Sequence, residues 1–112
     1  MRVLLDEMLP AGLADLLSDH EVTTVNRAGF TGLDNGELIR RAIGAGYEVP
    51  VTADRGLPAQ RNIAASGMAV VLVPGSRLTE LRDRADEISR AIADTRPGKV
   101  TRLPRVTDHR QP

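Results

Sequence analysis

The sequence contains no cysteine, and this absence excludes both a disulfide framework and a metal site built from thiolates. Aromatic residues are almost as scarce, since Phe30 and Tyr47 are the only two. We therefore do not expect a protein that recognises nucleic-acid bases by stacking them on aromatic side chains. With so few rings available, the core has to be built from leucine, valine, isoleucine and alanine.

Long apolar runs and nucleotide-binding loops are also lacking. The longest apolar runs fall far short of the roughly 18 residues that a membrane span requires. The three-residue stretch Val3–Leu5 is not the apolar region of a signal peptide, so we expect no membrane partner and a cytoplasmic location. The glycines are scattered and form no phosphate-binding pattern. His20 and His109 are the only histidines, which excludes a histidine-rich metal site.

Charge is balanced overall but uneven along the chain. The 112 residues include 15 basic and 15 acidic side chains, and their length suits one small domain, which we place over residues 1–95. Residues 96–112 form a basic, proline-containing tail, which is interpreted either as a solvated, partly disordered end or as a contact for nucleic acid or a partner. Its charged residues are Arg96, Lys99, Arg102, Arg105, Asp108 and Arg110.

Short apolar or β-branched runs alternate with stretches of helical periodicity. Strands are predicted over residues 2–5, 21–25, 48–53 and 68–73. Helices are predicted over about residues 10–18, 35–45, 58–66 and 78–93. Pro50 falls inside the third strand and predicts an edge position or a bulge there. The alternation predicts an α/β fold with a parallel sheet and helices on both faces.

Carboxylates follow two of these strands directly. Asp6 comes after the first strand and Asp54 after the third, and parallel strands deliver their carboxyl ends to one edge of a sheet. Glu37 lies in the first turn of a helix that begins at the same edge. A carboxylate at a buried strand end needs a partner or a metal, and clustered carboxylates suit a hard cation such as Mg²⁺ or Mn²⁺. These three residues therefore predict a site for metal-assisted phosphodiester hydrolysis.

Structural explanations stand beside this interpretation. Asp34 or Asn35 is also explained as the N-cap of the helix, with Glu37 completing a capping box. Asp54 can cap a turn. Glu7 can be a solvated carboxylate or can interact with the dipole of the helix that follows it.

At these residues the sequence resembles the small PIN-like nucleases, in particular the short toxin-type branch often encoded beside an antitoxin. The similarity covers about residues 1–95 and depends on four segments in order, VLLDE (3–7), HEVTTV (20–25), GLDNGELIRRA (32–42) and VTADRGL (51–57). It implies a three-layer α/β/α sandwich whose mainly parallel central sheet has about four to five strands. It also implies an acidic metal site at the carboxyl edge of that sheet.

The resemblance further implies an activity and its residues. The chain would be a Mg²⁺- or Mn²⁺-dependent endoribonuclease, the toxin of a toxin–antitoxin pair, with RNA as substrate and a cognate antitoxin protein as partner. Its catalytic residues and metal ligands would be Asp6, Glu37 and Asp54. The auxiliary groups expected around them are Glu7, Asp34 and Asn35.

Arginines accompany the predicted site. Arg55 and Arg61 flank the proposed site and are expected to bind the substrate, because guanidinium groups suit phosphate. Arg40 and Arg41 lie on the helix that carries Glu37. Each of these arginines is also explained as an ordinary solvated charge, and a homodimer is left open.

Three positions depart from the family pattern. Met8 stands where the branch commonly has Asn, Asn35 where many relatives have Asp, and Gly56 where many have a second acid after the third strand. The acidic site is therefore leaner than a four-acid PIN centre. The alternative function is a catalytically weak or inactive PIN-like fold that acts as a protein- or RNA-binding module.

Overall fold

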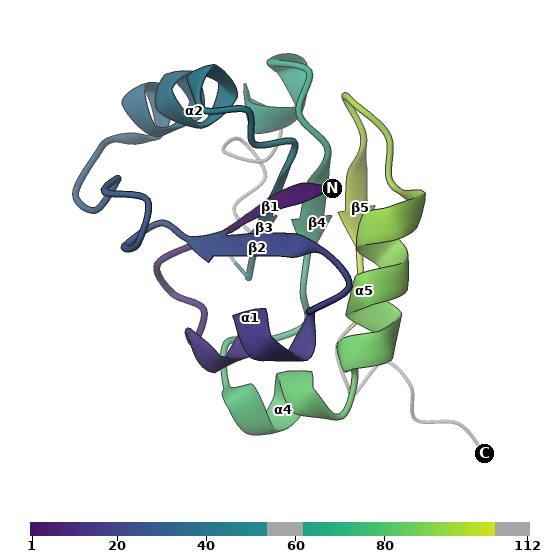
Figure 1. Ribbon diagram of the computed structural model, residues 1–112. Helices are drawn as coiled ribbons and strands as arrows, with labels where there is room; N and C mark the ends of the chain where they lie inside the picture. The colour runs from purple at the N-terminus through teal and green to yellow at the C-terminus, as the bar shows by residue number, and fades with distance from the viewer. Residues whose placement is uncertain (54–61, 105–112) are drawn as a thin grey trace.

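A five-stranded sheet forms the centre of the fold, and every neighbouring pair of its strands is parallel (Figure 1). The computed structural model describes residues 1–53 and 62–104 of the chain. The strands are β1 (Arg2–Leu5), β2 (Glu21–Thr24), β3 (Val49–Thr52), β4 (Val70–Leu72) and β5 (Val100–Arg102), in the order β2-β1-β3-β4-β5. The labelled helices are α1 (Gly12–Leu16), α2 (Asn35–Gly44), α4 (Leu78–Arg82) and α5 (Ala85–Asp94). The predicted α/β class and parallel sheet are confirmed.

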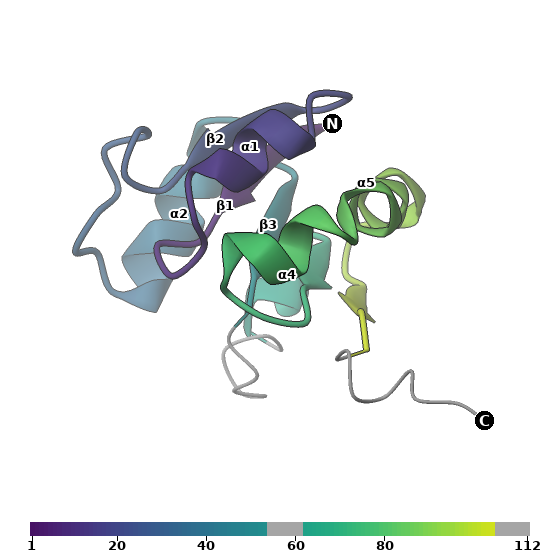
Figure 2. The same cartoon turned by 90° about the horizontal axis from the view of Figure 1, so that it is seen from below.

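Two apolar clusters cover the opposite faces of this sheet. In β1, Val3 and Leu5 enter one cluster, while Leu4 between them enters the other, because successive side chains of a strand alternate in direction. The first cluster includes Leu13 of α1, Leu81 of α4, and Ile88 and Ile92 of α5, and the second includes Ala42 of α2, Phe30 and Met68. Figure 1 accordingly has α2 above the sheet and α1 and α4 below it, and Figure 2 has α1 and α4 nearest the viewer with α2 behind.

The strand register brings the carboxyl ends of the central strands level with one another. Leu5, the last residue of β1, pairs with Thr24 in β2 and with Val51 in β3. Thr52, the last residue of β3, pairs with Leu72 in β4. Asp6 and Thr52 therefore become neighbours at the carboxyl edge of the sheet.

Pro50 lies in β3, which is the central strand, so the predicted edge position or bulge is wrong. Backbone groups of alternate residues face alternate neighbours: Val51 O accepts from Asp6 N (2.9 Å) toward β1, and Thr52 O accepts from Val73 N (2.8 Å) toward β4. Pro50 lies two residues before Thr52, so its backbone nitrogen, which carries no hydrogen, also faces β4. Backbone hydrogen bonds to the β4 segment lie on both sides of the proline, from Ala69 N to Glu48 O (3.1 Å) and from Val73 N to Thr52 O (2.8 Å), so the ladder lacks one donor at Pro50 and continues past it.

The helix predicted over residues 78–93 is two helices, α4 and α5. Arg84 separates them with a non-helical backbone (φ −117°, ψ 18°). Its guanidinium donates to both carboxylate oxygens of Glu87 (2.7 and 2.8 Å) and to Pro104 O. This side chain thus ties the start of α5 to the chain that follows β5.

The other differences from the predicted elements are smaller. The helix predicted over residues 10–18 is confined to Gly12–Leu16. Of the helix predicted over residues 58–66, residues 58–61 lie outside the described residues, and residues 62–65 are helical. β5 lies within residues 96–112, the segment set apart as a basic tail, and was not predicted. Within residues 1–53 and 62–104, every helix is too short or too polar to cross a lipid bilayer.

Candidate functional site

Asp6 lies directly after β1 and its carboxylate is held by two hydrogen bonds. Thr52 Oγ1 donates to Oδ2 at 2.7 Å, and the backbone N–H of Glu7 donates to Oδ1 at 2.7 Å. Thr52 itself is only 8% exposed, so its hydroxyl is fixed by the packed end of β3. The orientation of the Asp6 carboxylate is therefore set by the two central strands and the first turn after β1.

The half-buried Asp6 carboxylate keeps the capacity to bind a cation. A carboxylate has about four lone-pair positions, and the two hydrogen bonds occupy one on each oxygen. Met8 lies beside this group, with its Sδ 3.9 Å from Thr52 Oγ1, and the residue is 48% exposed. The single hydroxyl proton of Thr52 goes to the carboxylate, which is closer and charged. A thioether therefore stands next to Asp6 where the resemblance expects an amide.

Asp34 begins α2 as its N-cap, which resolves the choice left open between Asp34 and Asn35. Its Oδ1 accepts a hydrogen bond of 2.8 Å from the backbone N–H of Glu37, one of the orphan donors of the first turn. The structure shows no capping box at this helix start, and the carboxylate oxygens of Glu37 accept hydrogen bonds from arginines instead. Asp34, which was predicted to be an auxiliary residue of the site, thus caps the helix in the structure.

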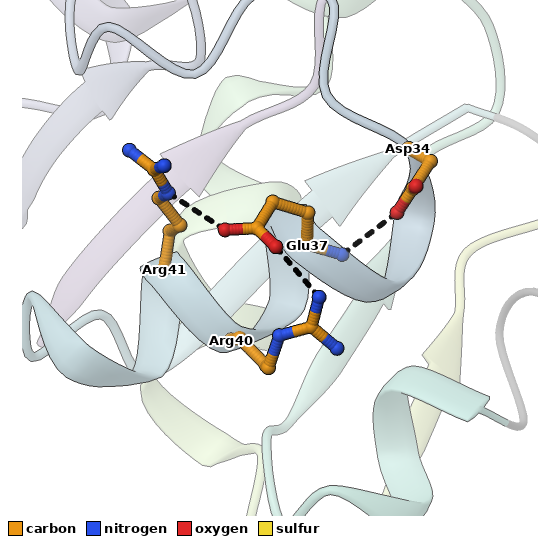
Figure 3. A network of polar contacts seen from close by, with 4 residues as sticks. All are labelled: Asp34, Glu37, Arg40 and Arg41. Atoms are coloured by element: carbon orange, nitrogen blue, oxygen red, sulfur yellow. Dashed lines mark hydrogen bonds and ion pairs between the residues drawn. The ribbon is translucent and has the colours of Figure 1, made fainter.

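Glu37 lies between two guanidinium groups on the same helix (Figure 3). Arg40 Nη2 donates to Oε1 at 2.6 Å and Arg41 Nε donates to Oε2 at 2.9 Å. The hydrogen bonds from Arg41 and Arg40 hold the pKa of the Glu37 carboxyl below its ordinary value. The same carboxylate raises the pKa of Arg40. Glu37 is therefore fully ionised at neutral pH and already partnered.

The remaining predicted site residues are placed as follows. Glu7 is exposed, and the contact it makes in the described structure is through its backbone. Asp54, Arg55, Gly56 and Arg61 lie outside the described residues, as does the side chain of Asn35. Among the residues that are described, no three acidic or histidine side chains gather into a metal-binding group. The convergence of Asp6, Glu37 and Asp54 stays a prediction.

Sequence reasoning missed two features of this region. Thr52 was not singled out, although a parallel register that pairs Leu5 with Val51 places residue 52 beside Asp6. The partners of Glu37 were also missed, although Arg40 and Arg41 stand three and four residues after it, the spacing at which helix side chains meet. The spacing of the arginines can be seen once the helix is assigned, whereas the position of Thr52 also requires the register between β1 and β3.

Comparison of the chain with protein-family models, with characterised proteins and with solved structures finds no match. The resemblance to the PIN-like nucleases therefore stays a prediction. Function has to be inferred from the oriented carboxylate of Asp6 and from the charged network around Glu37.

Proposed function

We propose that this chain is a PIN-like, metal-dependent endoribonuclease with a three-layer α/β/α sandwich. The observation that carries the proposal is the Asp6 carboxylate, held at the carboxyl edge of β1 by Thr52 Oγ1 at 2.7 Å. Ligand sites of open parallel sheets lie at this edge. The remaining lone pairs of that carboxylate fit a hard cation that prefers oxygen ligands.

Asp6, Glu37 and Asp54 would hold Mg²⁺ or Mn²⁺. A bound ion of this kind supplies a water of lowered pKa and neutralises charge on the phosphodiester. The residues of the chain contribute by presenting oriented carboxylates. Thr52 and the Glu7 N–H fix Asp6, and the Asp34 cap fixes the helix turn that carries Glu37. Arg55 and Arg61 would bind the RNA backbone, and a cognate antitoxin would be the protein partner in the cytoplasm.

A second function, a PIN-like module that binds RNA or protein without cleaving it, is favoured by one observation. The exposed Met8 thioether, and not an oxygen ligand, stands beside the Asp6–Thr52 pair. Under this alternative the fold is kept while the metal is bound weakly or not at all.

The decisive experiment incubates the purified chain with a structured RNA and Mn²⁺, alongside the variants Asp6→Asn and Asp19→Asn. Asp19 is an exposed acid between α1 and β2 and serves as the matched control. We expect cleavage by the wild type and by Asp19→Asn, and a loss of at least about a hundredfold in Asp6→Asn, as for removal of a group that acts in the chemical step. Cleavage that survives Asp6→Asn would remove Asp6 from the mechanism.

A Mn²⁺ titration by calorimetry separates the two functions. Binding that is lost in Asp6→Asn and retained in Asp19→Asn supports the enzyme. RNA binding without detectable metal binding or cleavage supports the non-catalytic module.

A further inference from the structure

The network around Glu37 uses both oxygens of one carboxylate. Arg40 holds Oε1 at 2.6 Å and Arg41 holds Oε2 at 2.9 Å, so the carboxylate is bracketed from two sides (Figure 3). The Arg40 and Arg41 side chains are 71% and 54% exposed, whereas that of Glu37 is 34% exposed. The arginines are thus more open to a ligand from solvent than the carboxylate between them.

Ion pairs of this exposure are weak and exchange readily. Exposed pairs at a spacing of three or four residues on a helix stabilise it only slightly, because water and salt screen them. A guanidinium binds a phosphodiester with the same forked donors that it offers to a carboxylate. An RNA strand that passes α2 therefore competes with Glu37 for the same two side chains.

We propose that Arg40 and Arg41 form a binding site for RNA phosphates and exchange partners when RNA binds, releasing the Glu37 carboxylate to the metal. This inference rests on the proposed nuclease function and adds to it the order of events at the site. Without RNA, the two arginines hold Glu37 and weaken its contribution to metal binding. With RNA present, the phosphates take over the arginines and Glu37 becomes a free oxygen ligand.

The exchange couples the two ligands. RNA that draws the arginines away from Glu37 strengthens metal binding, and by linkage the metal that draws Glu37 away strengthens RNA binding by the same factor. A chain with this device binds free metal poorly and assembles its site on the substrate. Asp34 stays at the helix N-cap throughout, because its carboxylate is engaged with the Glu37 backbone N–H at 2.8 Å.

The first test measures Mn²⁺ affinity by calorimetry on the whole chain without RNA. The double variant Arg40→Gln with Arg41→Gln should bind Mn²⁺ about two- to fivefold more tightly than the wild type, the factor that two exposed helix ion pairs correspond to. The control is Arg90→Gln, an exposed arginine on α5 for which the described part of the chain contains no ion pair, and its affinity should be unchanged. Glutamine retains helix propensity, and circular dichroism together with the two single variants verifies that α2 is intact.

The second test measures RNA binding in EDTA, where no cleavage intervenes. Glu37→Gln frees both arginines and should bind RNA about two- to fivefold more tightly than the wild type, while the double arginine variant should bind it more weakly. These opposite shifts are not expected if the arginines only stabilise the helix.

The outcomes separate this inference from the proposed function. If the wild type binds Mn²⁺ through Asp6 but the double arginine variant binds it no more tightly, the exchange is overturned and the metal site stands. If Glu37→Gln binds RNA no more tightly than the wild type, the exchange is likewise overturned. If no form of the chain binds Mn²⁺, the proposed metal site fails and the exchange fails with it.

Discussion

Thr52 and Asp6, at the carboxyl ends of two neighbouring parallel strands, are joined by a hydrogen bond of 2.7 Å from Oγ1 to Oδ2. The donor is buried and the acceptor is half-buried, so the packed strand end positions the more accessible group. Such a contact restricts the carboxylate to one orientation at the edge of the sheet. It connects the core packing of β3 with the chemistry proposed for Asp6.

Replacing Thr52 with valine tests this connection, because valine keeps the shape and removes the hydroxyl. We expect the free energy of unfolding in urea to fall by about 1 kcal/mol, since water replaces part of the lost hydrogen bond at the half-buried carboxylate. Under the proposed function, Mn²⁺ affinity should also fall about tenfold, as when a group that orients a metal ligand is removed. The control is Thr23→Val on β2, a half-buried threonine for which no side-chain hydrogen bond occurs among the described residues. Equal effects of the two substitutions would contradict the orienting role.

The Glu37 network predicts a pH dependence with a definite sign. The arginines lower the pKa of the folded Glu37 carboxyl below its ordinary value of 4.5, which the unfolded chain retains. The stabilisation is therefore present above pH 4.5 and is lost as the pH falls through the lower, folded pKa. Carboxyl NMR should report a Glu37 midpoint below 4.5 in the wild type and a midpoint closer to 4.5 in the double arginine variant. Because the network is exposed, high salt should also move the wild-type midpoint toward 4.5. A midpoint that changes neither with salt nor in the double arginine variant would exclude the ion pairs.

The elements that the sequence predicts best are those whose pattern is local. The apolar run of β1 and the apolar stripe of α2 each repeat with the period of their element, and both elements appear close to the predicted bounds. The break between α4 and α5 escapes such reasoning, because Leu81 and Ala85 keep the helical spacing across it. At this break the Arg84 side chain donates to Pro104 O, twenty residues away, a contact that periodicity cannot reveal. β5 was missed because three residues among basic and proline residues carry no periodic signal.

The site divides in the same way. The place of Asp6 followed from a rule about parallel strands, and the structure puts it at the expected edge. Its partner Thr52 depends on the register between β1 and β3, which hydrophobic pattern alone does not define. The position of Pro50 in a central strand was mispredicted because the rule against proline considers only the missing donor. Backbone hydrogen bonds on either side of it, from Ala69 N to Glu48 O and from Val73 N to Thr52 O, keep this strand paired with β4.

Arg84 offers a test of how α5 and the end of the sheet are joined. Its side chain is 10% exposed and donates to Glu87 and Pro104, so Arg84→Gln leaves these acceptors with fewer partners. We expect the free energy of unfolding to fall by about 1 to 2 kcal/mol, between the values for exposed and buried ion pairs. Hydrogen exchange should also accelerate in β5. Arg82→Gln, at an exposed arginine on α4, should change the stability by less than about 0.5 kcal/mol. A loss at Arg84 no larger than at Arg82 would show that the junction is held by apolar packing alone.

Two glycines at the end of α2 should respond to alanine with opposite signs. Gly44 is the last helical residue, and a Cβ there meets nothing within 4 Å, so Gly44→Ala should stabilise the chain by about 0.5 to 1 kcal/mol. Gly46 has φ +88°, and its N–H donates to Ile43 O while the next N–H donates to Ala42 O, the left-handed ending that favours glycine. A Cβ on Gly46 falls 2.6 Å from Nη1 of Arg2, whose side chain must move. Gly46→Ala should therefore destabilise the chain by about 1 to 2 kcal/mol in urea denaturation, and a shift of both variants in one direction would refute this helix ending.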